Sequence, residues 1–78
     1  MDKQDTQILR NPKNVKFNDL LRICVKYFGK QRITGSHHIF QMPWQGDPFV
    51  NIQDKNGMAK PYQVRKVIKA IEKLEELK

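Results

Sequence analysis

The hexapeptide Gly35-Ser36-His37-His38-Ile39-Phe40 marks the change from helical to extended periodicity, and it holds both histidines of the chain. Glycine favours a turn, because it adopts backbone angles that are closed to other residues. Ser36 can bond the local backbone at that turn while the chain opens into an extended run. The order therefore predicts a turn followed by a strand that begins at His37. Histidine exchanges protons readily near neutral pH, so the start of this strand is the candidate site for chemistry.

Alternation along the strand assigns the two histidines to opposite faces of a sheet. Neighbouring side chains of a strand point in opposite directions, so His38 shares a face with Phe40, and His37 shares the other with Ile39. The run from Phe49 to Gln53 alternates in the same way. The more apolar face carries Phe40, Met42, Val50 and Ile52. We expect that face to be buried, with His38 in a structural position and His37 on the open face.

Two amphipathic helices flank the extended segments. The first is predicted over residues 17–28, where Phe17, Leu20, Leu21, Cys24 and Phe28 form an apolar stripe that Gly29 ends. The second begins at Pro61, a favourable residue for the first turn, and its stripe consists of Val64, Val67, Ile68, Ile71 and Leu74. Three short strands are expected at residues 31–34, 37–42 and 49–53. One sheet face can bury both stripes, which predicts an α+β two-layer sandwich in the order helix, three-stranded antiparallel sheet, helix, like the double-stranded-RNA-binding domain.

The remaining segments are predicted to be irregular. Residues 1–15 are polar and lack clear periodicity, which indicates a flexible or loosely docked N-terminal arm before a single domain at 16–78, although Ile8 and Leu9 could attach it. Prolines bracket a loop at residues 43–48 that holds Trp44. Asp54-Lys55-Asn56-Gly57 is interpreted as a turn that leads into the second helix, because only three residues separate it from Pro61.

The charge of the chain favours an anionic partner. Fifteen Lys and Arg against eight Asp and Glu give a net charge of +7 in 78 residues. Nucleic acid is the first expectation, a membrane surface the second, and charge that serves only solubility the third. The candidate RNA contacts are Arg32, Lys60, Arg65, Lys66 and Lys69. Trp44 either stacks on an unpaired base or caps the edge of the core, and we favour the cap.

Several classes of protein are disfavoured by composition. Cys24 is the only cysteine, so the chain has neither an internal disulfide nor the usual Cys/His ligand set for zinc, and we expect no metal and no cofactor. A lone cysteine on an apolar stripe suits the reducing cytoplasm. No apolar run exceeds three residues, and the first residues are polar, which argues against a membrane span and a secretory signal.

These features together resemble the HicA family, over about residues 17–74. The resemblance lies in Gly35-Ser36-His37-His38-Ile39-Phe40, in the helix before it, and in Pro61 opening a basic helix. HicA proteins are small mRNA-cleaving toxins of toxin–antitoxin pairs, with a fold like the double-stranded-RNA-binding domain. The resemblance implies that His37 is catalytic, that Gly35 and Ser36 shape its turn, and that the partner is a HicB antitoxin covering the His37 face.

The resemblance also implies a mechanism without a metal. RNA carries its own nucleophile, the 2′-hydroxyl, so its cleavage requires positioning and proton transfer. His37 is the candidate general acid or base, and His38, a lysine or water is the candidate second proton carrier. Two alternatives remain open: a non-catalytic RNA-binding module of the same fold, and an interaction protein whose histidines only pack or contact a partner.

Overall fold

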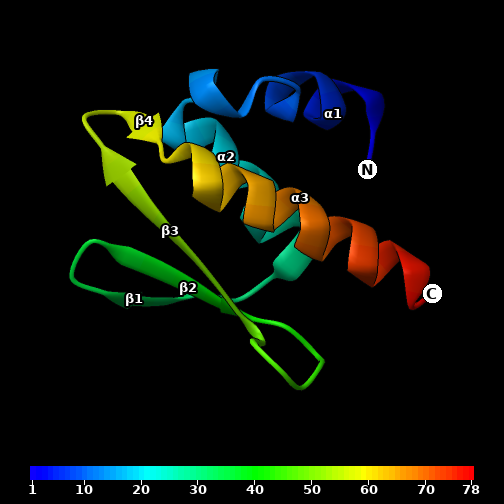
Figure 1. Cartoon of the computed structure of the whole chain (residues 1–78). Helices are drawn as coiled ribbons and strands as arrows, with labels where there is room; N and C mark the ends of the chain where they lie inside the picture. Colours follow the sequence, from blue (N-terminus) through cyan, green and yellow to red (C-terminus); the bar gives the residue numbers. More distant parts are fainter.

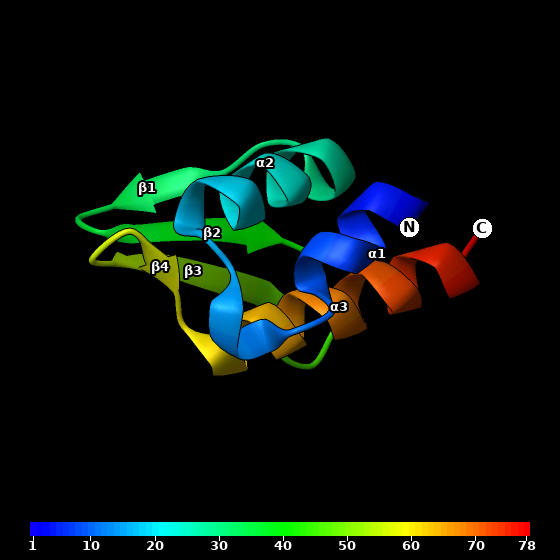
Figure 2. The ribbon, with the colours of Figure 1, turned by 90° about the horizontal axis from the view of Figure 1, so that it is seen from above.

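All residues 1–78 are described in the computed structural model, in which helices cover one face of a single antiparallel sheet (Figures 1 and 2). The elements are α1 (Lys3–Leu9), the 3-10 helix η1 (Pro12–Asn14), α2 (Phe17–Phe28), β1 (Arg32–Thr34), β2 (His37–Gln41), β3 (Phe49–Lys55), β4 (Met58–Ala59) and α3 (Pro61–Glu76). The strands lie in the order β1-β2-β3-β4. The predicted α+β class is confirmed, but the sheet has four strands instead of three, and an additional helix precedes α2.

The two longer helices begin where the periodicity predicts. α2 spans Phe17–Phe28, and it ends at Gly29, whose φ of 84° is in the region that favours glycine. α3 begins at Pro61 and continues to Glu76. Cys24 is fully buried in α2, and this burial raises the pKa of its thiol, so the side chain packs as a small apolar group. None of the helices combines the length and the apolar character needed to cross a membrane.

The core lies between the helices and the sheet face that carries Phe40. Phe40 and Ile52 are 0% exposed, and the ring of Phe28 lies 5.7 Å from that of Phe40, centroid to centroid. Leu20, Ile23, Val64 and Ile71 of the helices complete the centre of the core. The face predicted to be buried is therefore the buried one. Ile23 is a core residue that the predicted stripe of the first helix omitted.

The strand register places a second set of side chains together on the open face. His37 pairs with Gln53, Ile39 with Asn51, and Gln41 with Phe49. On the other side of β2, Thr34 pairs with His37 and Arg32 with Ile39. Directly opposed residues of antiparallel strands share a face, so these side chains line the surface that α2 and α3 leave uncovered.

The turn predicted within residues 54–57 is present at Asn56-Gly57, but it closes a hairpin between β3 and β4 instead of leading directly into α3. Both residues have positive φ, 53° and 85°, as a tight hairpin turn requires. The Asp54 carboxylate accepts a hydrogen bond from the Gly57 N–H at 2.6 Å. β4 is only two residues long, but its other edge is bonded to the chain before α2, where the Ala59 N–H donates to the Val15 carbonyl at 2.9 Å. Pairing on both edges supports a strand this short.

The N-terminal segment differs from the expected flexible or loosely docked arm, because it forms α1 and packs on α2 and α3. Leu9 is 2% exposed and belongs to the core, so it attaches this segment to the domain, as its apolar character suggested. Figure 1 shows α2 and α3 between α1 and the strands β1 and β2. The carboxylate of Asp2 caps the helix by accepting a hydrogen bond from the Asp5 N–H at 2.8 Å. This segment therefore extends the helical layer.

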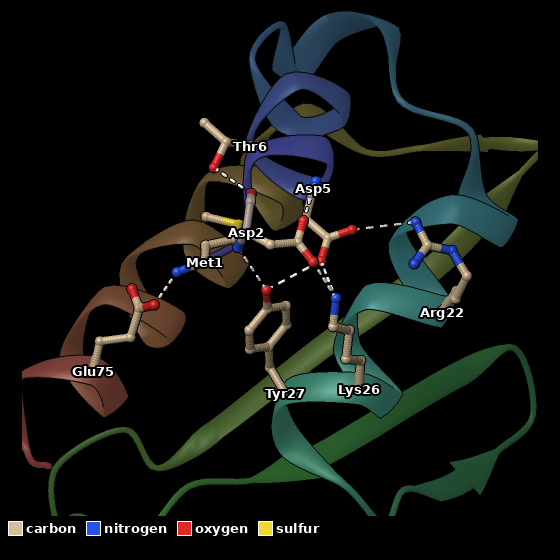
Figure 3. A network of polar contacts seen from close by, with 8 residues as sticks. All are labelled: Met1, Asp2, Asp5, Thr6, Arg22, Lys26, Tyr27 and Glu75. Atoms are coloured by element: carbon tan, nitrogen blue, oxygen red, sulfur yellow. Dashed lines mark hydrogen bonds and ion pairs between the residues drawn. The ribbon is translucent and has the colours of Figure 1, made fainter.

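A polar network holds α1 to the other helices (Figure 3). Asp5 is 1% exposed, and its carboxylate meets Arg22 at 3.3 Å, Lys26 at 2.9 Å and the Tyr27 hydroxyl at 3.1 Å. Lys26 also pairs with Asp2, and the chain N-terminus pairs with Glu75 of α3. These carboxylates raise the pKa of Lys26, and the hydrogen bond to Asp2 is the larger cause. Both oxygens of this buried carboxylate therefore have partners, and the removal of those donors would leave a costly buried charge.

Acid should weaken this attachment through Asp2. The hydrogen bond from Lys26, followed by that from the Asp5 N–H, lowers the pKa of the Asp2 carboxyl from 3.8 to about 2. A carboxyl with a lower pKa in the folded chain stabilises the fold above its unfolded pKa, and this contribution disappears as the pH falls from 3.8 towards 2. We expect wild type to melt above Asp2→Asn at neutral pH, and the difference to vanish near pH 2. Asparagine retains an N-cap acceptor but does not titrate.

The matched control is Asp19→Asn, because Asp19 lies in the first turn of α2 and makes none of the ion pairs. At neutral pH, Asp19→Asn should lower the melting temperature less than Asp2→Asn does, because Asp19 has no ion pair to lose. A wild-type advantage over Asp2→Asn that stays constant down to pH 2 would contradict the role of this carboxylate.

Candidate active site on the open sheet face

The two candidate histidines lie at the start of β2, directly after the turn at Gly35 and Ser36. Gly35 has a φ of 59°, so the turn uses the conformation that favours glycine. His37 is half-buried on the open face. Its Nδ1 lies 2.8 Å from Nδ2 of Asn51, and its Nε2 lies 3.2 Å from Nε2 of Gln53. Both ring nitrogens therefore contact amide groups from the neighbouring strand β3.

The geometry of these amides determines which nitrogen of His37 carries the proton. A neutral imidazole has one N–H and one acceptor nitrogen, so it can accept from only one of the two amide nitrogens. The Gln53 amide is held because its Oε1 accepts from the Lys60 ammonium at 2.9 Å, so its Nε2 is the donor to His37. The proton then belongs on Nδ1. The Asn51 amide, whose Oδ1 is buried without a hydrogen-bond partner, is the one that must turn to accept it.

Gln53 connects the histidine to the start of α3. Its N–H donates to the side-chain oxygen of Gln63 at 2.8 Å, and its own Oε1 accepts from Lys60 and, at 3.3 Å, from Gln63. Gln63 is 3% exposed, so this amide pair is built into the structure. The sequence analysis did not predict a role in the site for three amide residues, Asn51, Gln53 and Gln63. Strand alternation was the available signal, because it put the first two on the His37 face.

His38 lies on the opposite face, as strand alternation predicts. Its ring is 5.2 Å from the ring of Phe17 at the start of α2, centroid to centroid. Its Nδ1 lies 2.7 Å from the Oε1 of Gln31, an acceptor, so Nδ1 carries the proton. The sheet separates His38 from the chemistry available to His37.

The predicted basic contacts do not form one surface. Lys60 reaches Gln53, and Arg32 shares the open face with Ile39. Arg65 is exposed on α3, while Lys66 pairs with Asp47 at 2.8 Å. Lys66 and Lys69 line a separate cavity of about 240 Å³ beside Trp44.

Trp44 belongs to the edge of the core, which agrees with the favoured interpretation. It is half-buried and packs against the core cluster. The Lys73 ammonium lies 4.4 Å from the centroid of its ring, a cation–π contact that occupies one side of the indole. Trp44 therefore contacts α3 through Lys73.

Comparison of the chain with protein-family models, with curated proteins and with solved structures found no match. The open face places an imidazole with an acceptor nitrogen and an ammonium against the same Gln53 amide. This pair can accept a proton and stabilise negative charge at one place.

The proton positions make a direct spectroscopic prediction. At a pH at which both rings are neutral, His37 and His38 should each carry the proton on Nδ1, because Gln53 donates to His37 and Gln31 accepts from His38. Long-range proton–nitrogen NMR of the labelled protein reports the tautomer of each ring. Gln31→Leu is the control, since it removes the acceptor that favours the Nδ1–H tautomer of His38. The tautomer of His37 should not change. A proton found on Nε2 of His37 would contradict the role assigned to Gln53.

Proposed function

We propose that this chain is a HicA-type toxin: an endoribonuclease that cleaves mRNA in the cytoplasm without a metal and is restrained by a HicB-type antitoxin. The observation that carries the proposal is the open-face pair of His37 and Lys60, joined by Gln53. The motif Gly35-Ser36-His37-His38 and the net charge of +7 agree with this function. A partner seated on the open face would restrain the activity by excluding RNA from His37.

Cleavage would begin with removal of the 2′ proton by His37. The acceptor on the ring is Nε2, whose contact with the Gln53 amide is 3.2 Å long and is therefore easily exchanged. An RNA 2′-hydroxyl that replaces this amide as the donor would transfer its proton to Nε2 as the oxygen attacks the neighbouring phosphate. General base catalysis of this kind contributes roughly 10²–10⁴ in rate.

The developing negative charge requires a cation near His37, and Lys60 is the candidate because it contacts the same Gln53 amide. Its ammonium is held by Gln53 and not by a carboxylate, so its charge remains available to a phosphate. The leaving 5′ oxygen must receive a proton, which Lys60 or water would supply. His38 is unsuited to this role, because its ring packs on Phe17 behind the sheet.

The alternative function is a non-catalytic RNA-binding module. One observation favours it: both ring nitrogens of His37 already have amide partners, so the ring has a structural explanation without any substrate. The two functions differ in what the loss of His37 does. A binding module should keep its RNA unbroken with or without this side chain.

His37→Ala should abolish RNA cleavage while the protein stays folded. The substitution removes the proton acceptor, and it costs about 1 kcal/mol for each of the two amide contacts, less than the stability of a typical domain. Cleavage of a purified mRNA fragment is followed in the presence of a chelator, with circular dichroism as the folding check. His38→Ala is the matched variant, and it should lower the melting temperature while cleavage persists at permissive temperature.

The same variants can be compared in growing cells. Wild type expressed alone should stop growth, and a cognate antitoxin or His37→Ala should prevent this effect. Cleavage retained by folded His37→Ala protein would overturn the proposed catalytic role. Intact RNA with soluble wild type would favour the binding module.

Salt dependence should identify which cations contact RNA. Binding that releases counterions weakens as salt rises, with a slope of roughly 0.7 per phosphate contact on single strands. Arg32→Ala with Lys60→Ala should weaken binding and flatten this slope. Lys66→Ala with Lys69→Ala removes the same charge from the Trp44 side and should have the smaller effect. Equal effects of the two pairs would indicate nonspecific attraction by net charge.

A further inference from the structure

The sheet ends unevenly, and this leaves a cavity at the edge of β2. β1 pairs with β2 only as far as Arg32 opposite Ile39. β2 continues to Gln41, which has Phe49 of β3 as its partner on the other side. No β1 residue pairs with the last two residues of β2, and the segment between α2 and β1 frames the gap. A cavity of about 350 Å³ opens there.

The walls of this cavity combine an exposed aromatic ring with cations and amides. Phe49 is 45% exposed on the open face. Ile39 and Phe28 add apolar surface, Lys30 and Arg32 add positive charge, and no acidic residue lines the cavity. Proteins that bind single-stranded nucleic acid pair aromatic platforms with cationic grooves in this way. Charge complementarity therefore favours a polyanion as the occupant.

One wall is fixed from behind the sheet. Gln31 lines the cavity, and its Oε1 accepts from the Nδ1–H of His38 at 2.7 Å. His38 is itself held against the Phe17 ring. The Gln31 amide is thus held in one orientation, and Gln41 supplies a second amide to the same cavity. This support gives His38 a positioning role for the cavity.

We infer that this cavity binds one unpaired nucleobase of single-stranded RNA, stacked on Phe49. A volume near the lower end of the usual range for small-molecule sites, roughly 300–1,000 Å³, suits a single base, and a duplex keeps its bases stacked inside the helix. His37, Ile39 and Gln41 lie on one face at about 3.3 Å per residue, so an RNA strand along β2 meets both the histidine and the cavity. Cleavage near the bound base rests on the proposed function, whereas base binding does not require catalysis.

The test measures binding of a short, fluorescently labelled single-stranded RNA to the His37→Ala protein. This variant lacks the candidate general base, so the RNA should stay intact during the measurement. Phe49→Leu retains apolar bulk but loses the stacking surface, and should weaken binding by roughly five- to a hundred-fold. Phe49→Tyr should restore affinity close to that of the parent. Ile33→Ala is the matched control, because Ile33 is 58% exposed on the same edge of the sheet but is paired with His38 on the other face.

A second measurement leaves the protein unchanged. A series of the same RNA is made in which each member lacks the base at one position, and the member that lacks the bound base should bind the His37→Ala protein as weakly as the normal RNA binds to Phe49→Leu. A duplex of the same sequence should compete poorly with the labelled single strand. Unchanged affinity in Phe49→Leu, equal binding of all members of the series, or equal competition by the duplex would each overturn the base site. A protein partner that protects Phe49 from labelling, with no affinity for single-stranded RNA, would also overturn it.

The results separate this inference from the proposed function. Wild type that binds RNA through Phe49 but leaves it intact would support the base site and overturn the ribonuclease. If wild type and Phe49→Leu cleave RNA with the same KM, the ribonuclease is supported and the base site is overturned.

Discussion

Burial of Phe40 between the sheet and the helices is the constraint on which the rest of the structure depends. Its side chain is inaccessible to solvent and lies against the Phe28 ring. A shift of one residue in the register of β2 would move every side chain to the other face, and would bring Phe40 into water. The burial of this one ring therefore sets the position of its neighbours, with His38 turned towards α2 and His37 left on the open face.

The amide groups beside His37 turn a surface histidine into an organised site. Gln53 is bonded to the buried Gln63 and to Lys60, so its amide nitrogen faces the ring in a defined orientation. Polar groups of this kind are costly inside a protein unless they have partners. Gln53 has partners in Gln63, Lys60 and the His37 ring, whereas the Oδ1 of Asn51 is buried without one. The arrangement supports a proton acceptor at Nε2, and it also explains how the ring remains ordered before any ligand arrives.

The attachment of α1 shows how the chain uses its few acidic residues. A helix of seven residues is too short to persist alone, so α1 depends on Leu9 and on the contacts of Asp2 and Asp5 with α2. Arg22 and Lys26 are about half exposed, whereas Asp5 is buried. The loss of these contacts would therefore cost most at the Asp5 carboxylate, which would be left buried without a partner. Because α1 lies over the helices, it leaves the His37 face uncovered.

The sequence by itself determined the features that depend on local periodicity. It predicted the bounds of α2, the start of α3 at Pro61, and the opposite faces of His37 and His38, because apolar spacing and strand alternation repeat within a few residues. Tertiary structure alone decided the docking of α1, the pairing of β4, the amides around His37 and the cavity beside Gln41. Each of these joins residues that are distant in the chain, and their meeting depends on strand register and helix packing, which no local pattern encodes.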